Sequence, residues 1–356
     1  MLYRTVGIVE QIIIERPGLQ ELAVNVDSQM RTAVNLLDVN PRAEPGTKVM
    51  LNTVAVELGL GTGGMDFVTA VLENQWTADP PGHILKLRYT PLQMPTLAIE
   101  SQESPSHTAI SEFESLQGCP VVCCGLHSQI SAVCGSLNKI REEISITYIM
   151  TDEAALPISL SRTVSHLKRR GLIKHTITCG QAFGGEIEAV NLYSALAAAR
   201  AVAKADLIVV SQGPGNVGTG TPLGFSGIGQ GQALNAVAAL NGVPIAVPRI
   251  SFADMRERHH GISHHTLTVL ERITLAPALI AMPTLPEPER SLLQAEIDAS
   301  SIASRHKIHY FPVDAVLDSL ISDGIPFSTM GRNVQEDREF FLTAAAAGIL
   351  AEWYIP

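Results

Sequence analysis

The sequence is poor in basic residues and in charge altogether. Its 356 residues include 35 Asp and Glu against 25 Lys and Arg, a formal net charge of -10 with histidine counted as neutral. General nucleic-acid binding needs a basic face, because neutralising phosphates supplies most of the affinity. We therefore expect no nucleic-acid partner. Only 17% of the residues are charged and 46% are hydrophobic, which excludes disorder and favours a large core.

Cysteine is scarce as well, and long apolar runs are missing. Five cysteines, an odd number, exclude a disulfide scaffold and favour a reducing compartment. Near the N-terminus Glu10 and Glu15 bracket the apolar stretch Ile12–Ile14, which is too short for a signal peptide. Glycines and prolines break the uncharged stretch from Leu207 to Pro248, so it does not read as a membrane span. We expect a cytoplasmic protein with no membrane partner.

The first 75 residues have the pattern of short strands joined by tight turns. Apolar and polar residues alternate in runs that turn residues such as Arg16-Pro17-Gly18 separate. The predicted strands are Thr5–Val9, Glu21–Val26, Thr32–Leu37, Lys48–Leu58 and Met65–Leu72. With no convincing helix among them, residues 1–75 predict a small β-barrel or sandwich. Residues 76–117, with Pro80, Pro81, Pro91 and Pro95, predict an extended connector.

From residue 118 the pattern changes to apolar strands that alternate with longer helical segments. The predicted strands are Pro120–Cys124, Ser145–Thr151, His175–Cys179, Asp206–Ser211, Pro244–Ile250, Ala278–Met282 and Ile308–Pro312. The predicted helices are 128–142, 158–170, 186–204, 227–241, 264–273, 286–304, 314–322 and 334–353. Such alternation is typical of βαβ units. The chain is therefore expected to be α/β with an all-β N-terminal part: a small β-barrel followed by a doubly wound, mostly parallel sheet over residues 118–356.

The loops that follow the predicted strands carry the polar and glycine-rich segments. Ligands of open parallel sheets bind outside the carboxyl ends of the strands, so these loops form the expected site. His127 follows the first strand and Asp152 the second, where a carboxylate beside a histidine would tune a base. Gln181 follows the third strand, Arg249 lies at the end of the fifth, and Arg256 and Arg258 follow the fifth.

The loop after the fourth strand is the richest in glycine. It runs from Gly213 to Gly224, and its predicted ligand-binding residues are Gly213, Gly215, Asn216, Gly218, Thr219 and Gly220. Backbone N–H groups in a strand–glycine–helix passage favour an anion. No Gly-Lys-Ser/Thr follows, so it is not a P-loop, and a proline interrupts the dinucleotide spacing of the glycines. Tight structural packing is the alternative.

Four histidines crowd the segment from His259 to His265, namely His259, His260, His264 and His265. If Ser263 caps the next helix, His264 and His265 lie in its first turn. With the neighbouring arginines the segment predicts an anion clamp in which His264 is a ligand-binding residue, together with acid–base catalysis, for which His259 and His260 are the candidates. A metal site formed by the four imidazoles is a second interpretation, although their spacing matches no known metal signature. Helix capping and surface hydrogen bonding is the third.

Helices with small residues on every side are expected to be buried. The helix from Gly227 to Asn241 has no charge, and those around Leu196–Val202 and Thr343–Leu350 are rich in alanine. Such surfaces allow close contact with the sheet or with a second subunit, and a homodimer is the hypothesis they favour.

Four motifs together resemble an uncharacterised family of bacterial proteins, catalogued only as a domain of unknown function. They are Leu51–Gly64, Leu85–Pro91, Gly213–Gly224 and His259–Thr266, so the resemblance covers nearly the whole chain. It implies a bacterial cytoplasmic protein without an assigned activity, and it carries over no catalytic residue.

Three functions remain open from the sequence. The leading hypothesis is binding of a small anionic metabolite, phosphorylated or nucleotide-like, at the carboxyl edge of the sheet, with histidine acid–base or group-transfer catalysis. A non-enzymatic sensor or assembly scaffold is the second. A metal-dependent hydrolase that uses the cluster from His259 to His265 with Asp152 is the third. No cofactor is identified, because this architecture hosts many chemistries.

Overall fold

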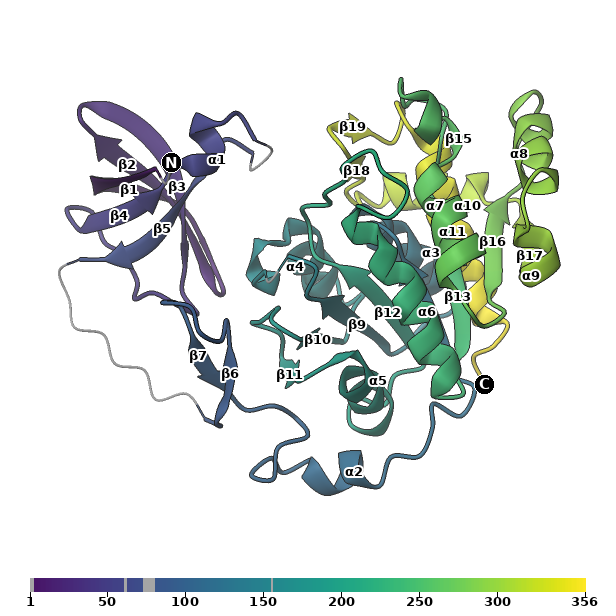
Figure 1. Cartoon of the computed structure of the whole chain (residues 1–356), viewed down its shortest axis with the longest axis horizontal. Coiled ribbons are helices and arrows are strands. Elements are labelled where there is room, and N and C mark those ends of the chain that lie inside the picture. The colour runs from purple at the N-terminus through teal and green to yellow at the C-terminus, as the bar shows by residue number, and fades with distance from the viewer. Residues whose placement is uncertain (1–2, 61–62, 73–80, 155) are drawn as a thin grey trace.

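The computed structural model of the chain describes residues 3–60, 63–72, 81–154 and 156–356. A closed five-stranded barrel is followed by an eight-stranded, all-parallel sheet with helices on both faces (Figure 1). The fold expected from the sequence is confirmed. Gly61 and Thr62 of the Leu51–Gly64 motif lie outside the described residues, as do residues 76–80 of the expected connector.

The barrel has its own small core. Its strands are β1 (Arg4–Arg16), β2 (Leu19–Val26), β3 (Gln29–Leu36), β4 (Lys48–Asn52) and β5 (Asp66–Val71), in the closed order β1-β2-β3-β5-β4. The strand predicted over Lys48–Leu58 is too long, since it ends at Asn52 and a one-turn helix, α1 (Val54–Glu57), follows. The Asn52 side chain accepts a hydrogen bond from the Val54 N–H and turns the chain there.

The barrel touches the second part of the chain through the turn between β1 and β2. Ser159 Oγ donates to the Gly18 carbonyl at 3.3 Å, and Arg162 forms an ion pair with Glu21 at 2.7 Å. Ser159 lies in a 3-10 turn (Ile158–Leu160) just before helix α4 (Arg162–Arg169), and Arg162 is the first residue of that helix. The barrel therefore contacts the segment that leads into α4.

The stretch between the two parts is more structured than an extended connector. A two-stranded hairpin, β6 (Ile84–Lys86) and β7 (Met94–Thr96), and a short helix, α2 (His107–Ser111), lie within it. Buried Lys86 donates to the Ala182 carbonyl at 2.8 Å and pairs with Glu188 at 3.0 Å. This buried ion pair fastens the connector to the edge of the parallel sheet.

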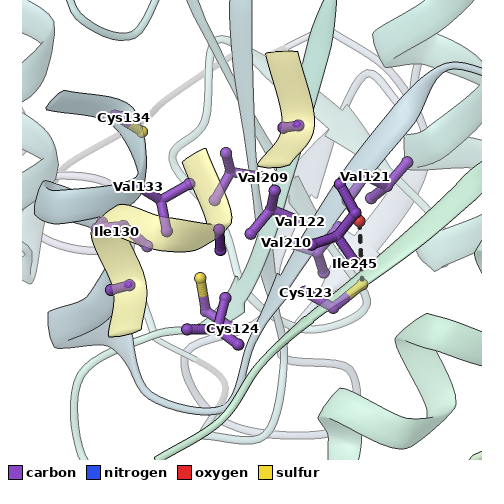
Figure 2. Close-up of a cluster of buried hydrophobic side chains, with 14 of the residues drawn as sticks. Val121, Val122, Cys123, Cys124, Ile130, Val133, Cys134, Val209, Val210 and Ile245 are labelled. Atoms are coloured by element: carbon purple, nitrogen blue, oxygen red, sulfur yellow. Dashed lines mark hydrogen bonds between the residues drawn. The ribbon is translucent and has the colours of Figure 1, made fainter. Parts of the chain in front are cut away.

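The parallel sheet lies at the centre of the main core. Its strands are β8 (Pro120–Cys124), β9 (Ile146–Thr151), β10 (His175–Cys179), β11 (Ile187–Ala189), β12 (Leu207–Gln212), β13 (Val243–Val247), β16 (Leu279–Pro283) and β17 (Lys307–Phe311). Every residue of β8 and β12 is buried, as expected for central strands covered on both faces. Figure 2 shows Cys123, Cys124 and Cys134 among the valines of this core. All five cysteines are buried free thiols.

Most of the predicted helices are present, some of them shortened or divided. They are α3 (Ile130–Ile140), α4 (Arg162–Arg169), α5 (Leu192–Ala201), α6 (Gly229–Ala239), α7 (His264–Thr268), α8 (Glu289–Asp298), α9 (Ile302–Arg305), α10 (Asp314–Ser322) and α11 (Arg338–Glu352). Short 3-10 turns precede α3 (His127–Gln129), α4 (Ile158–Leu160) and α6 (Ser226–Ile228), and a π-helical turn, Val269–Ile273, follows α7.

The helix predicted over 186–204 begins too early. Its first residues instead form the edge strand β11, which pairs in parallel with β10, and α5 starts after Asn191. The Asn191 side chain accepts hydrogen bonds from the N–H groups of Tyr193 and Ser194. This N-cap satisfies two free backbone donors and fixes where the helix begins.

The order of the strands places a crevice near the middle of the sheet. The order is β11-β10-β9-β12-β8-β13-β16-β17. Parallel crossovers are right-handed, so the chain leaves β8 and β9 toward one face and β12 and β13 toward the other. The contacts agree, because α3, α4, α10 and α11 pack together on one face and α5 and α6 on the other. Ligands of doubly wound sheets bind where neighbouring connections diverge in this way.

Two small ribbons stand above this carboxyl edge. They are β14 (Ile250–Ser251) with β15 (Gly261–Ile262), and β18 (Ser328–Thr329) with β19 (Arg332–Asn333). The predicted strand Pro244–Ile250 is thus divided, since β13 ends at Val247 and the chain bends into β14. No helix among the described residues has the length and apolar character needed to cross a membrane.

Candidate functional site

Three of the four clustered histidines meet at one point above the carboxyl edge. His259 ends a 3-10 turn (Glu257–His259), and His264 and His265 open α7, which Ser263 caps as the sequence predicts. One ring nitrogen from each of the three lies within 4.8 Å of the others. The ring centroids are 4.3 to 4.9 Å apart. The turn and the capped helix therefore bring together side chains five and six residues apart in the sequence.

These three imidazoles are neutral at neutral pH. Burial, with Arg249 and Arg256 nearby, lowers the pKa of His259 to about 3. Burial and the neighbouring His264 lower the pKa of His265 to about 4, and burial also lowers that of His264. At pH 7 the rings are therefore neutral, the form of imidazole that binds a metal ion, and the low pKa values of His259 and His265 make these two rings poor general bases and poor general acids.

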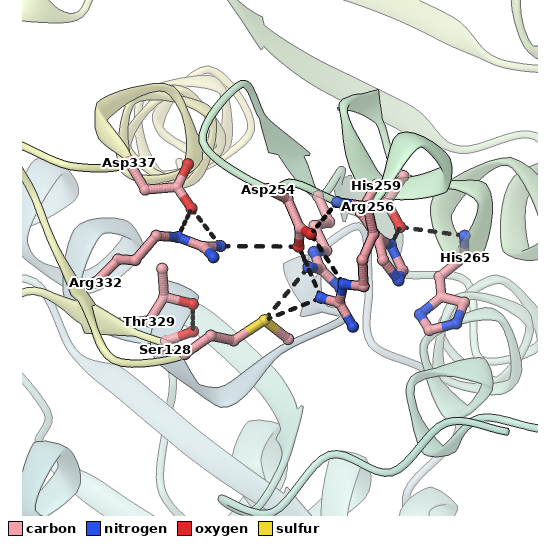
Figure 3. Close-up of polar contacts among 11 residues, drawn as sticks. Ser128, Asp254, Arg256, His259, His265, Thr329, Arg332 and Asp337 are labelled. Carbon is pink, nitrogen blue, oxygen red and sulfur yellow. Dashed lines mark hydrogen bonds and ion pairs between the residues drawn. The ribbon is translucent and has the colours of Figure 1, made fainter. Parts of the chain in front are cut away.

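An arginine cluster lies next to the histidines (Figure 3). Arg249 and Arg256 both donate to Oδ2 of Asp254 at 2.7 Å, and Arg256 also donates to Oδ1 at 2.9 Å. These bonds, above all those from Arg256, hold the pKa of Asp254 far below its usual range. Burial lowers the pKa of Arg249 to about 10, so it stays charged at pH 7. Two guanidinium groups share one carboxylate, which leaves a positive charge uncompensated.

A hairpin near the C-terminus closes the other side of this cluster. Arg332, on β19, pairs with Asp337 at 2.8 Å and lies 3.9 Å from Asp254 (Figure 3). Met330 Sδ is 3.3 Å from Arg249, and Thr329 Oγ1 is 3.0 Å from Ser128 Oγ at the start of α3. Apart from Arg249, the residues of this cluster are not among the site residues predicted from the sequence; they are Ser128, Asp254, Thr329, Met330, Arg332 and Asp337. The sequence does indicate Asp254, because this residue lies between Arg249 and Arg256. It gives no indication of Arg332, because the hairpin that carries Arg332 is far from these residues along the chain.

The glycine-rich loop reaches the histidines through its far end. Phe225 stacks on His265, and Gly218 lies against the same ring, since a Cβ there would be 3.6 Å from Cε1 of His265. Asn216 holds the loop together by accepting hydrogen bonds from Gln212 and Ser226. Among the described residues, no hydrogen bond uses the N–H groups of Gly215 and Asn216. Thr219 and Gly220 are exposed. Gly213 instead packs against Met150.

Two residues of the predicted anion clamp lie to the side of the three histidines. His260 is exposed and packs edge-on against Phe252, with ring centroids 5.4 Å apart. Arg258 is exposed, and its charge contributes to the lowered pKa of His264. The structure therefore separates His260 from His259, His264 and His265.

His127 is tied into the protein by both ring nitrogens. Nε2 lies 2.7 Å from Ser161 Oγ, and Nδ1 lies 3.1 Å from the Tyr148 hydroxyl and 3.2 Å from the Gln212 carbonyl. Burial lowers its pKa to about 4. Through these hydrogen bonds His127, which follows β8, is tied to β9, to the end of β12 and to the N-cap of α4.

Asp152 and Gln181 lie in a separate, acidic part of the edge. They line a cavity of about 310 Å³ together with Arg88 from the connector and Glu153. The Gln181 N–H donates to Asp152 at 3.0 Å, and burial raises the pKa of Glu153. The sequence places one site along the whole edge, whereas the structure has an acidic cavity and a basic, histidine-rich region.

Cavity size limits what the basic region can enclose. The cavity lined by Asn216, Phe225, Arg249 and His265 measures about 20 Å³. That volume suffices for a water-sized guest and no more. This cavity therefore cannot enclose a phosphate or any larger group.

Residues 32–348 match the model of a family described as "Protein of unknown function (DUF3866)". The match covers most of the chain, from Thr32 within β3 of the barrel through the whole parallel sheet. The resemblance to a domain of unknown function, stated from the sequence motifs, is thereby confirmed, whereas the bacterial origin stays a prediction. No curated protein matches the chain.

Proposed function

We propose that this chain, which belongs to the DUF3866 family of proteins of unknown function, binds a small anionic metabolite at the carboxyl edge of its parallel sheet. The main observation that supports this proposal is that Arg249 and Arg256 both form ion pairs with the same carboxylate, that of Asp254. Arg332 is neutralised by its own partner, Asp337, and adds no free charge. One positive charge therefore remains for a phosphate or carboxylate group.

Arg256 is the residue best placed to meet the ligand. Its side chain is 46% exposed, whereas that of Arg249 is 6% exposed. Nε and one Nη of Arg256 are used by Asp254, which leaves the second Nη free to donate. Asp254 thus orients the guanidinium group, so little side-chain entropy remains to be lost on binding.

The position in the fold supports the same site. Arg249 follows β13 and the glycine-rich loop follows β12, and these strands flank β8 where the connections diverge to opposite faces. The unused N–H groups of Gly215 and Asn216 add neutral donors on the loop. Guanidinium and backbone N–H groups together are the usual receptors for phosphate.

A reducing compartment is part of this proposal. Cys119, Cys123, Cys124, Cys134 and Cys179 are all free and buried. Burial raises the pKa of Cys134 and of Cys179 to about 12, which keeps both thiols protonated and unreactive. We infer a cytoplasmic metabolite-binding protein.

The test is a calorimetric titration of chelator-treated protein with inorganic phosphate and with adenosine monophosphate. We expect Arg256→Gln to weaken binding by about tenfold or more, because a hydrogen bond to a charged group contributes about 1.5–3 kcal/mol. Arg256→Lys keeps the positive charge, so its affinity for the anion should lie between those of the wild type and of Arg256→Gln. Arg290→Gln, an exposed arginine on α8 that pairs with Glu287, is the control. Equal binding by the wild type and Arg256→Gln, or no binding of either probe, contradicts the proposal.

A further inference from the structure

We propose that His259, His264 and His265 bind a divalent transition-metal ion of the zinc type, with three imidazole ligands and a fourth position open to water or an anion. This site goes beyond the anion site proposed above and does not depend on it. Three histidines with an open fourth position is one of the common ligand sets of catalytic zinc.

The geometry requires only a small adjustment. The three candidate ligand nitrogens lie within 4.8 Å of one another. In a tetrahedral site with metal–nitrogen bonds of about 2.0–2.1 Å, they would be about 3.3 Å apart. The ligands must therefore close by about 1.5 Å at most, which a small side-chain rotation, chiefly of His264 on the first turn of α7, can supply.

An unsatisfied ring nitrogen is the second, independent observation. Nε2 of His264 is buried, and no hydrogen-bond partner for it exists among the described residues. Leaving a buried polar atom unpaired costs about 1–3 kcal/mol. With Nε2 as the ligand atom of His264, a metal ion between the three rings would give this nitrogen a partner.

The other two rings are held in orientations that suit ligands. Nδ1 of His259 is 2.7 Å from Ser263 Oγ, which leaves Nε2 available for the metal. His265 is fixed by face-to-face stacking on Phe225. Metal-binding histidines typically use their second nitrogen in this way, and the outer contact sets the ring orientation. Neutral imidazole, the form that binds metal, is also the form present here at pH 7.

The nearby arginines shape what else the metal binds. Arg249, Arg256 and Arg258 repel a cation, and they all contribute to the lowered pKa of His264. An anion in the fourth coordination position offsets this repulsion. We therefore expect phosphate to increase the affinity for the metal, and the metal to increase the affinity for phosphate by the same factor.

The experiment is a titration of chelator-treated full-length protein with Co²⁺ alone, read by the visible absorption of four-coordinate Co²⁺ and by displacement with Zn²⁺. We expect one ion per chain. His264→Ala and His259→Ala should each lower the affinity by at least about tenfold. His260→Ala is the matched control, because His260 lies on the same segment but outside the cluster, and it should bind Co²⁺ as the wild type does.

Two further measurements keep the result decisive. Circular dichroism shows whether each variant is folded, and His265→Gln replaces any variant that is not. X-ray absorption of the wild-type protein with Zn²⁺ needs no variant and should report about three imidazole nitrogens and no sulfur. Absence of saturable binding, sulfur ligation, or unchanged affinity in folded His264→Ala overturns the proposal. The anion test uses metal-free protein and this one omits the anion, so either proposal can fail alone.

Discussion

The ring of His265 lies parallel to the ring of Phe225, with centroids 3.8 Å apart and an angle of 3° between the planes. Phe225 ends the loop that follows β12, and His265 belongs to the segment that follows β13. Those two strands are separated in the sheet by β8. The stacked pair therefore joins two loops across the crevice, and the glycine-rich loop sets the orientation of a proposed metal ligand.

Phe225→Leu tests this connection. Leucine keeps most of the buried apolar volume but has no flat face, so the ring of His265 is no longer fixed. We expect the affinity for Co²⁺ to fall by about tenfold, the effect usual for residues that orient a metal ligand. The free energy of unfolding should fall by less than about 1.5 kcal/mol, because the swap conserves hydrophobic character.

The control for that substitution is Phe252→Leu. Phe252 packs against His260, which lies outside the cluster of three histidines. We expect its affinity for Co²⁺ to equal that of the wild type. If both variants bind alike, the stacking on His265 does not orient a ligand.

Asp254→Asn tests the charge balance of the arginine cluster. Arg249 and Asp254 are only 5% and 4% exposed, so the substitution leaves a buried guanidinium without its anionic partner. We expect the free energy of unfolding to fall by about 3 kcal/mol, measured by urea denaturation at pH 7. Asp314→Asn, which breaks an exposed ion pair with Arg338, should cost less than about 1 kcal/mol. Equal losses would mean that Asp254 does not neutralise a buried charge.

The parallel sheet was the part of the fold that sequence patterns determine best. A central strand such as Pro120–Cys124 must be apolar on both faces, and its bounds are predicted to the residue. The edge strand β11 carries no such signal, because it has only three residues and two of them are partly exposed. The three residues Ile187–Ala189 therefore look like the first turn of the helix that follows them. Only the parallel pairing with β10 shows that these three residues are a strand and not the first turn of a helix.

The site was predictable where one short segment carries it. Ser263 as a helix cap places His264 and His265 in one turn, and the structure has that arrangement. Sequence spacing alone could not separate His260 from His259, because adjacent residues on an irregular turn point in directions that only packing decides. Asp254, Met330 and Arg332 meet through contacts between segments more than 70 residues apart. Their proximity in the fold therefore cannot be predicted from the sequence alone.

Gly348→Ala tests the close packing of α11 on α3. A Cβ at this position would lie 2.2 Å from Ser136 Oγ and 2.4 Å from the Val133 carbonyl oxygen, so a backbone atom must move. We expect a loss of about 2 kcal/mol in the free energy of unfolding. Gly135→Ala on α3 is the control, because its Cβ would meet only the end of the Leu320 side chain at 3.0 Å. At Gly135 the higher helix propensity of alanine should offset the cost of moving the Leu320 side chain. The free energy of unfolding should therefore stay within about 1 kcal/mol of the wild-type value.

That contact also bears on the expected homodimer. The alanine-rich helix predicted around Thr343–Leu350 buries its small residues against α3, β13 and β16 within the same chain. The uncharged helix α6 packs against β8, β12 and β13 in the same way. Neither surface needs a second subunit to be covered. The homodimer stays a prediction, which the mass from light scattering tests directly.

The buried position of His127 leads us to expect a lower free energy of unfolding in acid. Its pKa is about 4 in the folded protein because it is buried, below the 6.5 of an ordinary histidine. Above pH 6.5 the ring is neutral in both states and contributes nothing to the pH dependence. As the pH falls from 6.5 toward 4, the unfolded chain binds a proton that the folded chain does not, so folding weakens. Below pH 4 both states are protonated and the loss reaches its limit.

His127→Gln removes this titration and isolates it from the other histidines. Between pH 7 and pH 4.5 we expect the free energy of unfolding of the wild type to fall by about 2 kcal/mol more than that of the variant. The variant should be less stable than the wild type at pH 7, because the hydrogen bond to Ser161 is altered, yet its acid slope should be shallower. Urea denaturation at the two pH values measures both quantities. Parallel curves for the two proteins would mean that His127 takes up its proton in the folded state, and therefore that water reaches the junction of the three strands it connects.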